Sequence, residues 1–215
     1  MPRWSGLLHN GLRDAFHACA RHAGLPATVE KGERVREDGT TSNCRPGDIK
    51  IPGAHGFQPA HGRVILADVV VANAVCATYR AKCAETCGGA ANGAAKSKRN
   101  KVERLDSVSK DDFFMPLAFE SEGYSVPSMS ALLFGFAKHR LFHDGLDEDT
   151  SLLHRLHSNY MDAIASAHAR GLARCLLERG MSNFDAIAGR VQPHIPPIGL
   201  ERLQRAQPRQ TEAHW

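Results

Sequence analysis

Apolar and polar positions follow two different periods along this chain, and the change of period divides it into regions. Residues 7–23 carry apolar side chains at helical spacing, and a glycine and a proline follow, so a first amphipathic helix is predicted there. Helical spacing returns at residues 128–142. A long helix is predicted to run to about residue 179, with Thr150 as its N-cap. The pattern thus predicts helices on both sides of a central region.

The first part of the central region is a predicted β-hairpin over residues 48–71. Residues 49–51 alternate between apolar and polar side chains, as a half-buried strand does. Residues 64–71 form a nearly continuous run of β-branched side chains, which is typical of a strand buried on both faces. Glycines and prolines between these two runs indicate the connecting loop.

Three other segments complete the central region. Residues 28–30 are expected to begin a strand, and residues 113–119 are expected to form the third core strand. Between the hairpin and that third strand, residues 76–105 have helical character. Glycines are expected to split or unwind this helical segment, namely Gly88, Gly89 and Gly93.

Together these elements predict an α/β fold in which helices flank a mixed sheet. With 215 residues the chain is long enough for one large domain. We expect this domain to span residues 1–190, with a core at about 9–140 and a helical extension at about 150–180. Residues 191–215 are polar and contain few apolar side chains, so this tail is expected to be disordered.

Two aspartates are the first candidates for chemistry. Asp48 stands at the start of the first predicted strand, and Asp68 interrupts the apolar run of the second. A buried carboxylate is costly unless it is paired, protonated or bound to a metal. If the strands pair as a hairpin, both acids come to lie near one end of the sheet. Mg²⁺ or Mn²⁺ needs only one or two carboxylates in addition to substrate phosphates, so this pair would suffice.

A cluster of basic residues follows on the predicted helix. Lys98 and Lys101 are three residues apart and share one helix face, so either could act beside a phosphate. The net charge of the chain is only +4, and the basic character is therefore local. Such a patch attracts a phosphate backbone without reading sequence, which favours duplex DNA as partner. The residues expected to bind DNA are Lys96, Arg99 and Arg104.

Each of these motifs also has a purely structural interpretation. The RPGD tetrapeptide at residues 45–48 is also an ordinary turn, and a lysine run is often a solvated helix face. The six cysteines have no spacing that indicates a disulfide framework or a zinc site. No apolar run approaches the roughly 20 residues that span a bilayer, so we expect no membrane contact and an intracellular protein.

The order of three motifs resembles a known family. RPGD, DVVV (residues 68–71) and KRNKV (residues 98–102) are similar to elements of the restriction-like endonuclease domain of site-specific non-LTR retrotransposon proteins. HNGLRDAF (residues 9–16) and FFMPLAFESEG (residues 113–123) are further matches. The family is a variant of the PD-(D/E)XK nuclease fold in which the lysine has moved from the second strand onto the helix. Val70 stands where the usual lysine would be.

The resemblance implies DNA cleavage with Mg²⁺ or Mn²⁺ held by Asp48 and Asp68, the Val69 carbonyl being a further candidate ligand. It also implies an extra acid, for which Glu30 is the candidate, and the alternative is that Glu30 is a surface residue beside Lys31. Glu120 matches an acid of the relatives and would either pair with the helix lysines or cap a turn. An upstream reverse transcriptase region in a larger polyprotein and access to nuclear DNA are implied as well.

Two departures from the family pattern leave other functions open. Gly47 is inserted before Asp48, and Val102 replaces a frequent tyrosine. The zinc element that precedes the family's HN dipeptide is not found in this sequence, and His9 would be its last remnant. The alternatives are a catalytically inactive nucleic-acid-binding or interaction module that keeps the nuclease fold, and a translated relic without a role.

Overall fold

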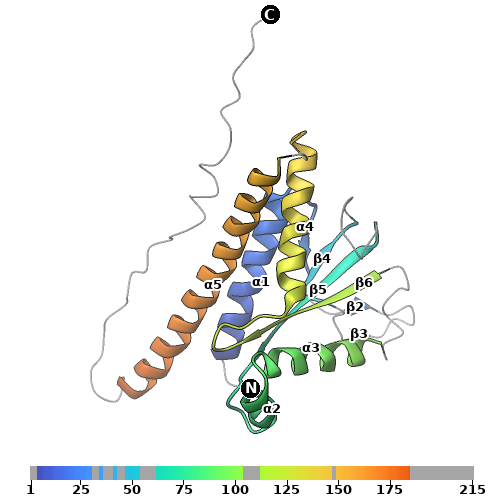
Figure 1. Ribbon diagram of the computed structural model, residues 1–215. Helices are drawn as coiled ribbons and strands as arrows, with labels where there is room; N and C mark the ends of the chain where they lie inside the picture. Colours follow the sequence, from blue (N-terminus) through green and yellow to red (C-terminus); the bar gives the residue numbers. More distant parts are fainter. Residues whose placement is uncertain are drawn as a thin grey trace, which may run out of the picture.

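The computed structural model describes residues 4–30, 34–35, 41–42, 47–53, 62–103, 112–146 and 149–184. Its centre is a four-stranded mixed sheet in the order β1-β4-β5-β6 (Figure 1). The strands β1, β4 and β5 pair antiparallel, and β5 and β6 pair parallel. Their bounds are Thr28–Val29 for β1, Ile49–Ile51 for β4, Val64–Ala72 for β5 and Asp112–Glu120 for β6. The predicted mixed α/β architecture is thus confirmed.

Helices cover both faces of this sheet (Figure 1). One face packs against three helices, α1 (Trp4–His22), α4 (Pro127–His143) and α5 (Thr150–Phe184). The other face packs against α3 (Gly89–Val102), which follows the short helix α2 (Arg80–Glu85). A separate pair of two-residue strands is formed by β2 (Arg34–Val35) and β3 (Thr41–Ser42).

The hairpin and the third core strand lie where the sequence pattern predicts them. Antiparallel pairing places Ile49 opposite Ala67 and Ile51 opposite Ile65, so the hairpin is confirmed. The helical segment after it breaks at Gly88, whose φ of 79° is a left-handed conformation that suits glycine. Gly93, by contrast, remains inside α3.

The expected N-cap of the last helix is wrong by one residue. The Asp149 side chain accepts a 2.8 Å hydrogen bond from the Leu152 amide, and Thr150 is already the first helical residue. An aspartate is as good an N-cap as a threonine, and only the backbone path decides between neighbours. Residues 185–215, including the tail expected to be disordered, lie outside the described residues.

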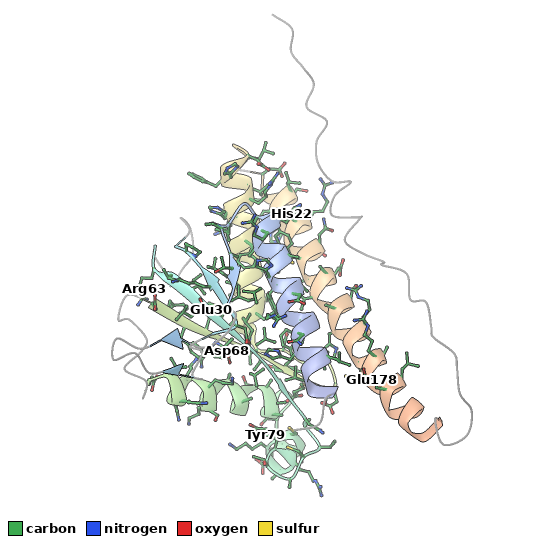
Figure 2. The ribbon with its side chains drawn as sticks, turned by 180° about the vertical axis from the view of Figure 1, so that it is seen from behind. His22, Glu30, Arg63, Asp68, Tyr79 and Glu178 are labelled. Carbon is green, nitrogen blue, oxygen red and sulfur yellow. The ribbon has the colours of Figure 1, made fainter. Side chains whose placement is uncertain are left out.

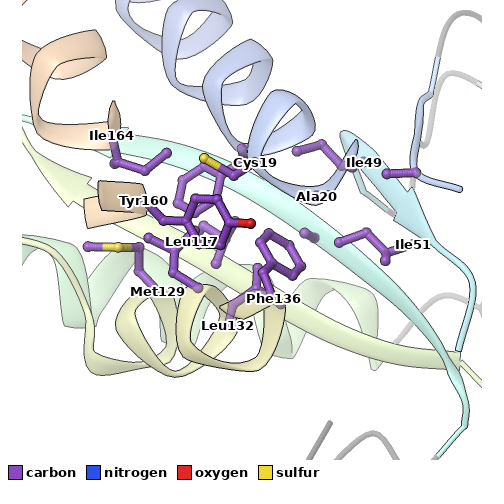
Figure 3. Close-up of a cluster of buried hydrophobic side chains, with 14 of the residues drawn as sticks. Cys19, Ala20, Ile49, Ile51, Leu117, Met129, Leu132, Phe136, Tyr160 and Ile164 are labelled. Carbon is purple, nitrogen blue, oxygen red and sulfur yellow. The ribbon is translucent and has the colours of Figure 1, made fainter. Parts of the chain in front are cut away.

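The main core lies between the sheet and the three helices α1, α4 and α5 (Figure 3). Alternate residues of β5 point into it, because successive strand side chains face opposite sides. Large side chains fill this layer, including the fully buried Leu12, Phe16, Leu117, Phe136 and Tyr160. Cys19 and Cys175 are also buried in it. Within the described residues, no helix is both long enough and apolar enough to cross a membrane.

The opposite layer, between the sheet and α3, is built from small side chains. It contains Ala72 and Ala118 from the sheet and four alanines of the helix, Ala90, Ala91, Ala94 and Ala95. Alanine side chains allow a helix to lie close to a strand. This close approach brings the polar residues of α3 within reach of the sheet.

Candidate functional site

Asp48 and Asp68 are neighbours on adjacent strands. The Asp48 amide donates a 2.8 Å hydrogen bond to the Ala67 carbonyl, and the Asp48 Oδ2 atom accepts one of 2.9 Å from the Val69 amide. Ala67 and Val69 flank Asp68 in β5, so Asp48 lies across from Asp68. Both side chains are largely buried, with exposed side-chain fractions of 11% for Asp48 and 9% for Asp68. The two predicted metal ligands are therefore brought together.

Glu30, the third predicted acid, follows at the next strand. Its backbone amide donates a 2.9 Å hydrogen bond to the Asp48 carbonyl, directly after β1. Glu30, Asp48 and Asp68 thus lie side by side at the neighbouring strands β1, β4 and β5. Figure 2 shows Glu30 and Asp68 in the same region. Glu30 is half-buried. The structure describes its position, and its role stays a prediction.

Gly47, the departure from the family pattern, has a local reason. A Cβ atom at this position would lie 3.0 Å from the Ala67 carbonyl oxygen and 3.2 Å from the Leu66 carbonyl carbon. A side chain here would therefore push the start of β4 away from β5. The glycine lets the chain carry Asp48 close to Asp68, while Arg45 and Pro46 lie outside the described residues.

Lys98 is the basic residue that reaches the acids. Its Nζ atom lies 2.9 Å from Asp68 Oδ2, in an ion pair that lacks the alignment of a hydrogen bond. Lys98 follows Ala91 and Ala94 by seven and four residues, so it continues the stripe of α3 that faces the sheet. The small side chains before it allow the helix to approach Asp68.

The other basic residues of α3 have a different environment. Lys101, which the sequence does not distinguish from Lys98, is exposed, as are Lys96 and Arg99. Three residues of separation do not place two side chains in equal contact with a sheet, because a helix touches it along a narrow stripe. Lys98 is half-buried and faces the acids, whereas these three residues face solvent. Arg104 lies outside the described residues.

His9 is a member of the site that the chemical analysis of the sequence misses. Its Nε2 atom lies 2.9 Å from Asp48 Oδ2, and its Nδ1 atom lies 3.3 Å from the Asn10 side-chain oxygen. His9 belongs to α1 and precedes Asp48 by 39 residues. The HN dipeptide marks the position, but no local pattern connects a helix residue with a distant strand.

Burial and charge set the protonation of this group. The hydrogen bond to Asp48 raises the pKa of His9 above 6.5 despite burial. Burial acts to raise the pKa of Asp48, but the contacts from His9 and the Val69 amide outweigh it, and that pKa ends below its usual value. Burial raises the pKa of Asp68, and the Lys98 ammonium only partly offsets it. Asp48 therefore stays ionised to a lower pH than Asp68 does.

The donor set fits a hard cation of the Mg²⁺ or Mn²⁺ type. Two neighbouring buried carboxylates supply the oxygen ligands that such ions prefer. Asp68 Oδ2 is buried with an ion-pair partner and no aligned hydrogen-bond donor, so its lone pairs remain able to bind. Within the described part of the chain, no group of three or more His, Cys, Asp or Glu side chains is arranged to hold a metal. Any ion here would keep ligands from water or substrate.

The Glu120 side chain has a role that neither expectation names. Its Oε1 atom accepts hydrogen bonds of 2.8 Å and 3.2 Å from the amides of Ala90 and Ala91. These amides belong to the first turn of α3, where backbone donors lack helical partners. The buried Glu120 carboxylate therefore caps α3 and ties it to the end of β6, and the predicted lysine pairing is not what the structure shows. The Glu120 backbone carbonyl does close the expected turn, because it accepts a 3.0 Å hydrogen bond from the Gly123 amide.

Comparisons with models of protein families, with curated proteins and with solved structures find no match to this chain. The function proposed below therefore rests on the arrangement of the side chains and on the order of the sequence motifs.

Proposed function

We propose that this chain is a Mg²⁺- or Mn²⁺-dependent endonuclease domain that hydrolyses DNA phosphodiester bonds. The observation that carries the proposal is the placement of Asp48 and Asp68 on adjacent strands, with Lys98 of α3 in an ion pair with Asp68. Two neighbouring acids with a lysine beside one of them can bind a divalent ion next to a phosphate. The proposal includes a PD-(D/E)XK-type fold and descent from a non-LTR retrotransposon protein, both suggested by the motif order.

The three side chains have separate tasks in this proposal. Asp48 and Asp68 would hold the ion, which when bound supplies Lewis-acid polarisation of the phosphate and a more acidic water. Lys98 lies at Asp68 and would place its ammonium group next to the phosphate oxygen on which negative charge develops. Burial of both acids keeps water from weakening these interactions.

The position of the lysine supports the family variant in particular. Val70, where a strand lysine would stand, packs against the alanine layer. The ammonium group at Asp68 comes instead from α3, through Lys98. This is the arrangement that the resemblance implies, with the helix replacing the strand as source of the lysine.

The exposed face of α3 supports duplex DNA as the substrate. Lys96, Arg99 and Lys101 are exposed on the same helix that carries Lys98. Phosphate contacts of this kind position a duplex without reading its sequence. A backbone that binds along this face would pass the acids at the Lys98 end.

A plasmid-nicking assay tests the proposal with a matched pair of lysine variants. Supercoiled plasmid is incubated with the purified full chain and Mg²⁺ or Mn²⁺, and Asp68→Asn is expected to abolish nicking. Lys98→Met should lower the nicking rate at saturating DNA by about 100-fold or more, as loss of one preorganised donor does. Lys101→Met is the control and should retain most of the rate. Nicking that survives Asp68→Asn, or equal losses in the two lysine variants, would refute the assignment.

The second candidate is a DNA-binding module without cleavage. The ion pair between Lys98 and Asp68 favours it, because Lys98 already neutralises one of the two acids. In that case DNA binding is retained and weakens with salt through counterion release, while no nicking occurs. Salt-dependent binding by a protein that does not nick under either metal would select this module over the nuclease.

A further inference from the structure

We propose that His9 is a positioning residue of this site, which orients the Asp48 carboxylate for the metal. The inference rests on the proposed function, because it names how one metal ligand of that site is held. His9 would not touch the metal or the phosphate, and it would act only through Asp48.

The geometry shows two donors directed at the same oxygen. Asp48 Oδ2 is 2.9 Å from His9 Nε2 and 2.9 Å from the Val69 amide nitrogen. A carboxylate oxygen has two lone pairs, so these two contacts occupy the acceptor capacity of Oδ2. The Oδ1 atom is then the oxygen that would meet a cation.

The two donors come from independent elements, which removes rotational freedom from the carboxylate. The Val69 amide is part of β5, while His9 is carried by α1. On either side of His9 along that helix, Leu8 and Leu12 are buried in the main core, with exposed fractions of 1% and 0%. The imidazole is therefore held by a packed helix, and the amide alone would leave the carboxylate free to rotate about one contact.

Because His9 holds one proposed metal ligand in place, the loss of its contact with Asp48 should lower the affinity for the metal. Partners that hold a ligand in place typically change metal affinity by about 10- to 100-fold when they are removed. Asp48 is one of only two carboxylates proposed to bind the ion, so a change in its orientation affects half of the carboxylate ligands. The loss should thus be visible in metal binding itself, apart from any cleavage.

The test uses two amide side chains that differ by one methylene group. Glutamine can place its amide nitrogen where His9 Nε2 lies, whereas the asparagine amide is too short to reach Asp48. Mn²⁺ binding to the purified full chain is titrated by EPR of the free ion, and thermal unfolding is recorded in parallel. We expect His9→Asn to weaken Mn²⁺ binding by about 10-fold or more, and His9→Gln to stay within about 3-fold of the parent.

A histidine of the same helix supplies the structural control. His17 Nε2 lies 3.1 Å from the Ala27 carbonyl, so it also ties α1 to another segment, the one that leads into β1. His17→Asn should leave Mn²⁺ affinity unchanged even if it lowers the unfolding temperature. A loss of affinity in both asparagine variants would show a general effect of α1 and would overturn the inference.

The outcomes separate this inference from the proposed function. If Asp48→Asn and Asp68→Asn bind Mn²⁺ as the parent does, the proposed metal site itself is wrong. If these two variants lose binding while His9→Asn and His9→Gln both match the parent, the metal site stands and the positioning role is refuted. Tighter binding by His9→Asn would also refute it, because His9 would then occupy an oxygen that the metal needs.

Discussion

The two faces of the central sheet are built in opposite ways. Towards α1, α4 and α5 the sheet packs against large side chains such as Phe16, Phe136 and Tyr160. Towards α3 it packs against alanines, and two buried acids, Asp68 and Glu120, contact that helix. Burial of a large apolar side chain contributes about 1.5–3 kcal/mol, far more than an alanine does. The first face therefore provides most of the stability.

The difference indicates why Lys98 can reach Asp68 from the alanine side. A thick layer of leucine and phenylalanine would separate α3 from the sheet and keep Lys98 away from Asp68. Alanines bring the helix close, and polar contacts from Lys98 and Glu120 then hold it in place. One face supplies the folding energy that the other, weaker face requires.

Leu117→Ala tests the stabilising face. Leu117 is fully buried in β6 and points towards the three helices. Its truncation leaves a cavity, and we expect the free energy of unfolding to fall by about 2–5 kcal/mol. Urea denaturation of the purified chain measures this loss. A cost below about 1 kcal/mol would show that this layer is not the main source of stability.

Ala118→Leu tests the close approach of α3 at the adjacent residue. Ala118 is also fully buried, but it faces the alanine layer. The larger side chain overpacks that layer, so we expect a loss of about 1–3 kcal/mol. It should also separate Lys98 from Asp68 and so reduce nicking. If denaturation and nicking both remain at parent levels, α3 does not need its close contact.

Glu120→Ala tests the cap that fixes the start of α3. Two backbone amides lose their acceptor in this variant. The expected loss of unfolding free energy is about 0.5–2 kcal/mol, the usual effect of a lost N-cap. Glu120→Gln is the matched control, since its carbonyl oxygen can still accept from both amides, and it should lose less. Equal losses would assign the effect to charge instead of capping.

His9 and His22 offer the mildest test, because they lie on one helix in contrasting environments. The hydrogen bond to Asp48 raises the pKa of His9, while burial lowers the pKa of His22, both from 6.5. NMR titration should therefore show His9 protonating at higher pH than His22. The His9 contribution to stability is complete below pH 6.5 and is lost as pH rises through its raised pKa.

The His22 contribution has the opposite sign. It is present above pH 6.5 and is lost as pH falls through the lowered pKa of the folded state. Asp48→Asn should lower the pKa of His9 and leave His22 unchanged, which makes His22 an internal control. A common pKa for the two histidines would contradict the environments described here.

The pattern of apolar and polar residues is sufficient to locate most of the helices and strands and to single out the candidate acids. Apolar periodicity locates the hairpin of β4 and β5 and the helices, because each element must bury one side locally. Asp68 stands out for the same reason, as a single charge within an apolar run. The mixed sheet with flanking helices follows from the order of these elements, while their boundaries shift by a residue or more, as at Asp149.

Which side chains contact one another depends on how the elements pack, and local sequence patterns do not contain this information. Lys98 and Lys101 are equivalent in the sequence, and the choice depends on which stripe of α3 touches the sheet. The contact of His9 with Asp48 joins a helix and a strand that are far apart in the chain. The spacing of apolar residues along the chain indicates which side of its own helix or strand each residue buries. It does not indicate the packing of one element on another, which sets the distances between side chains and therefore the chemistry of the site.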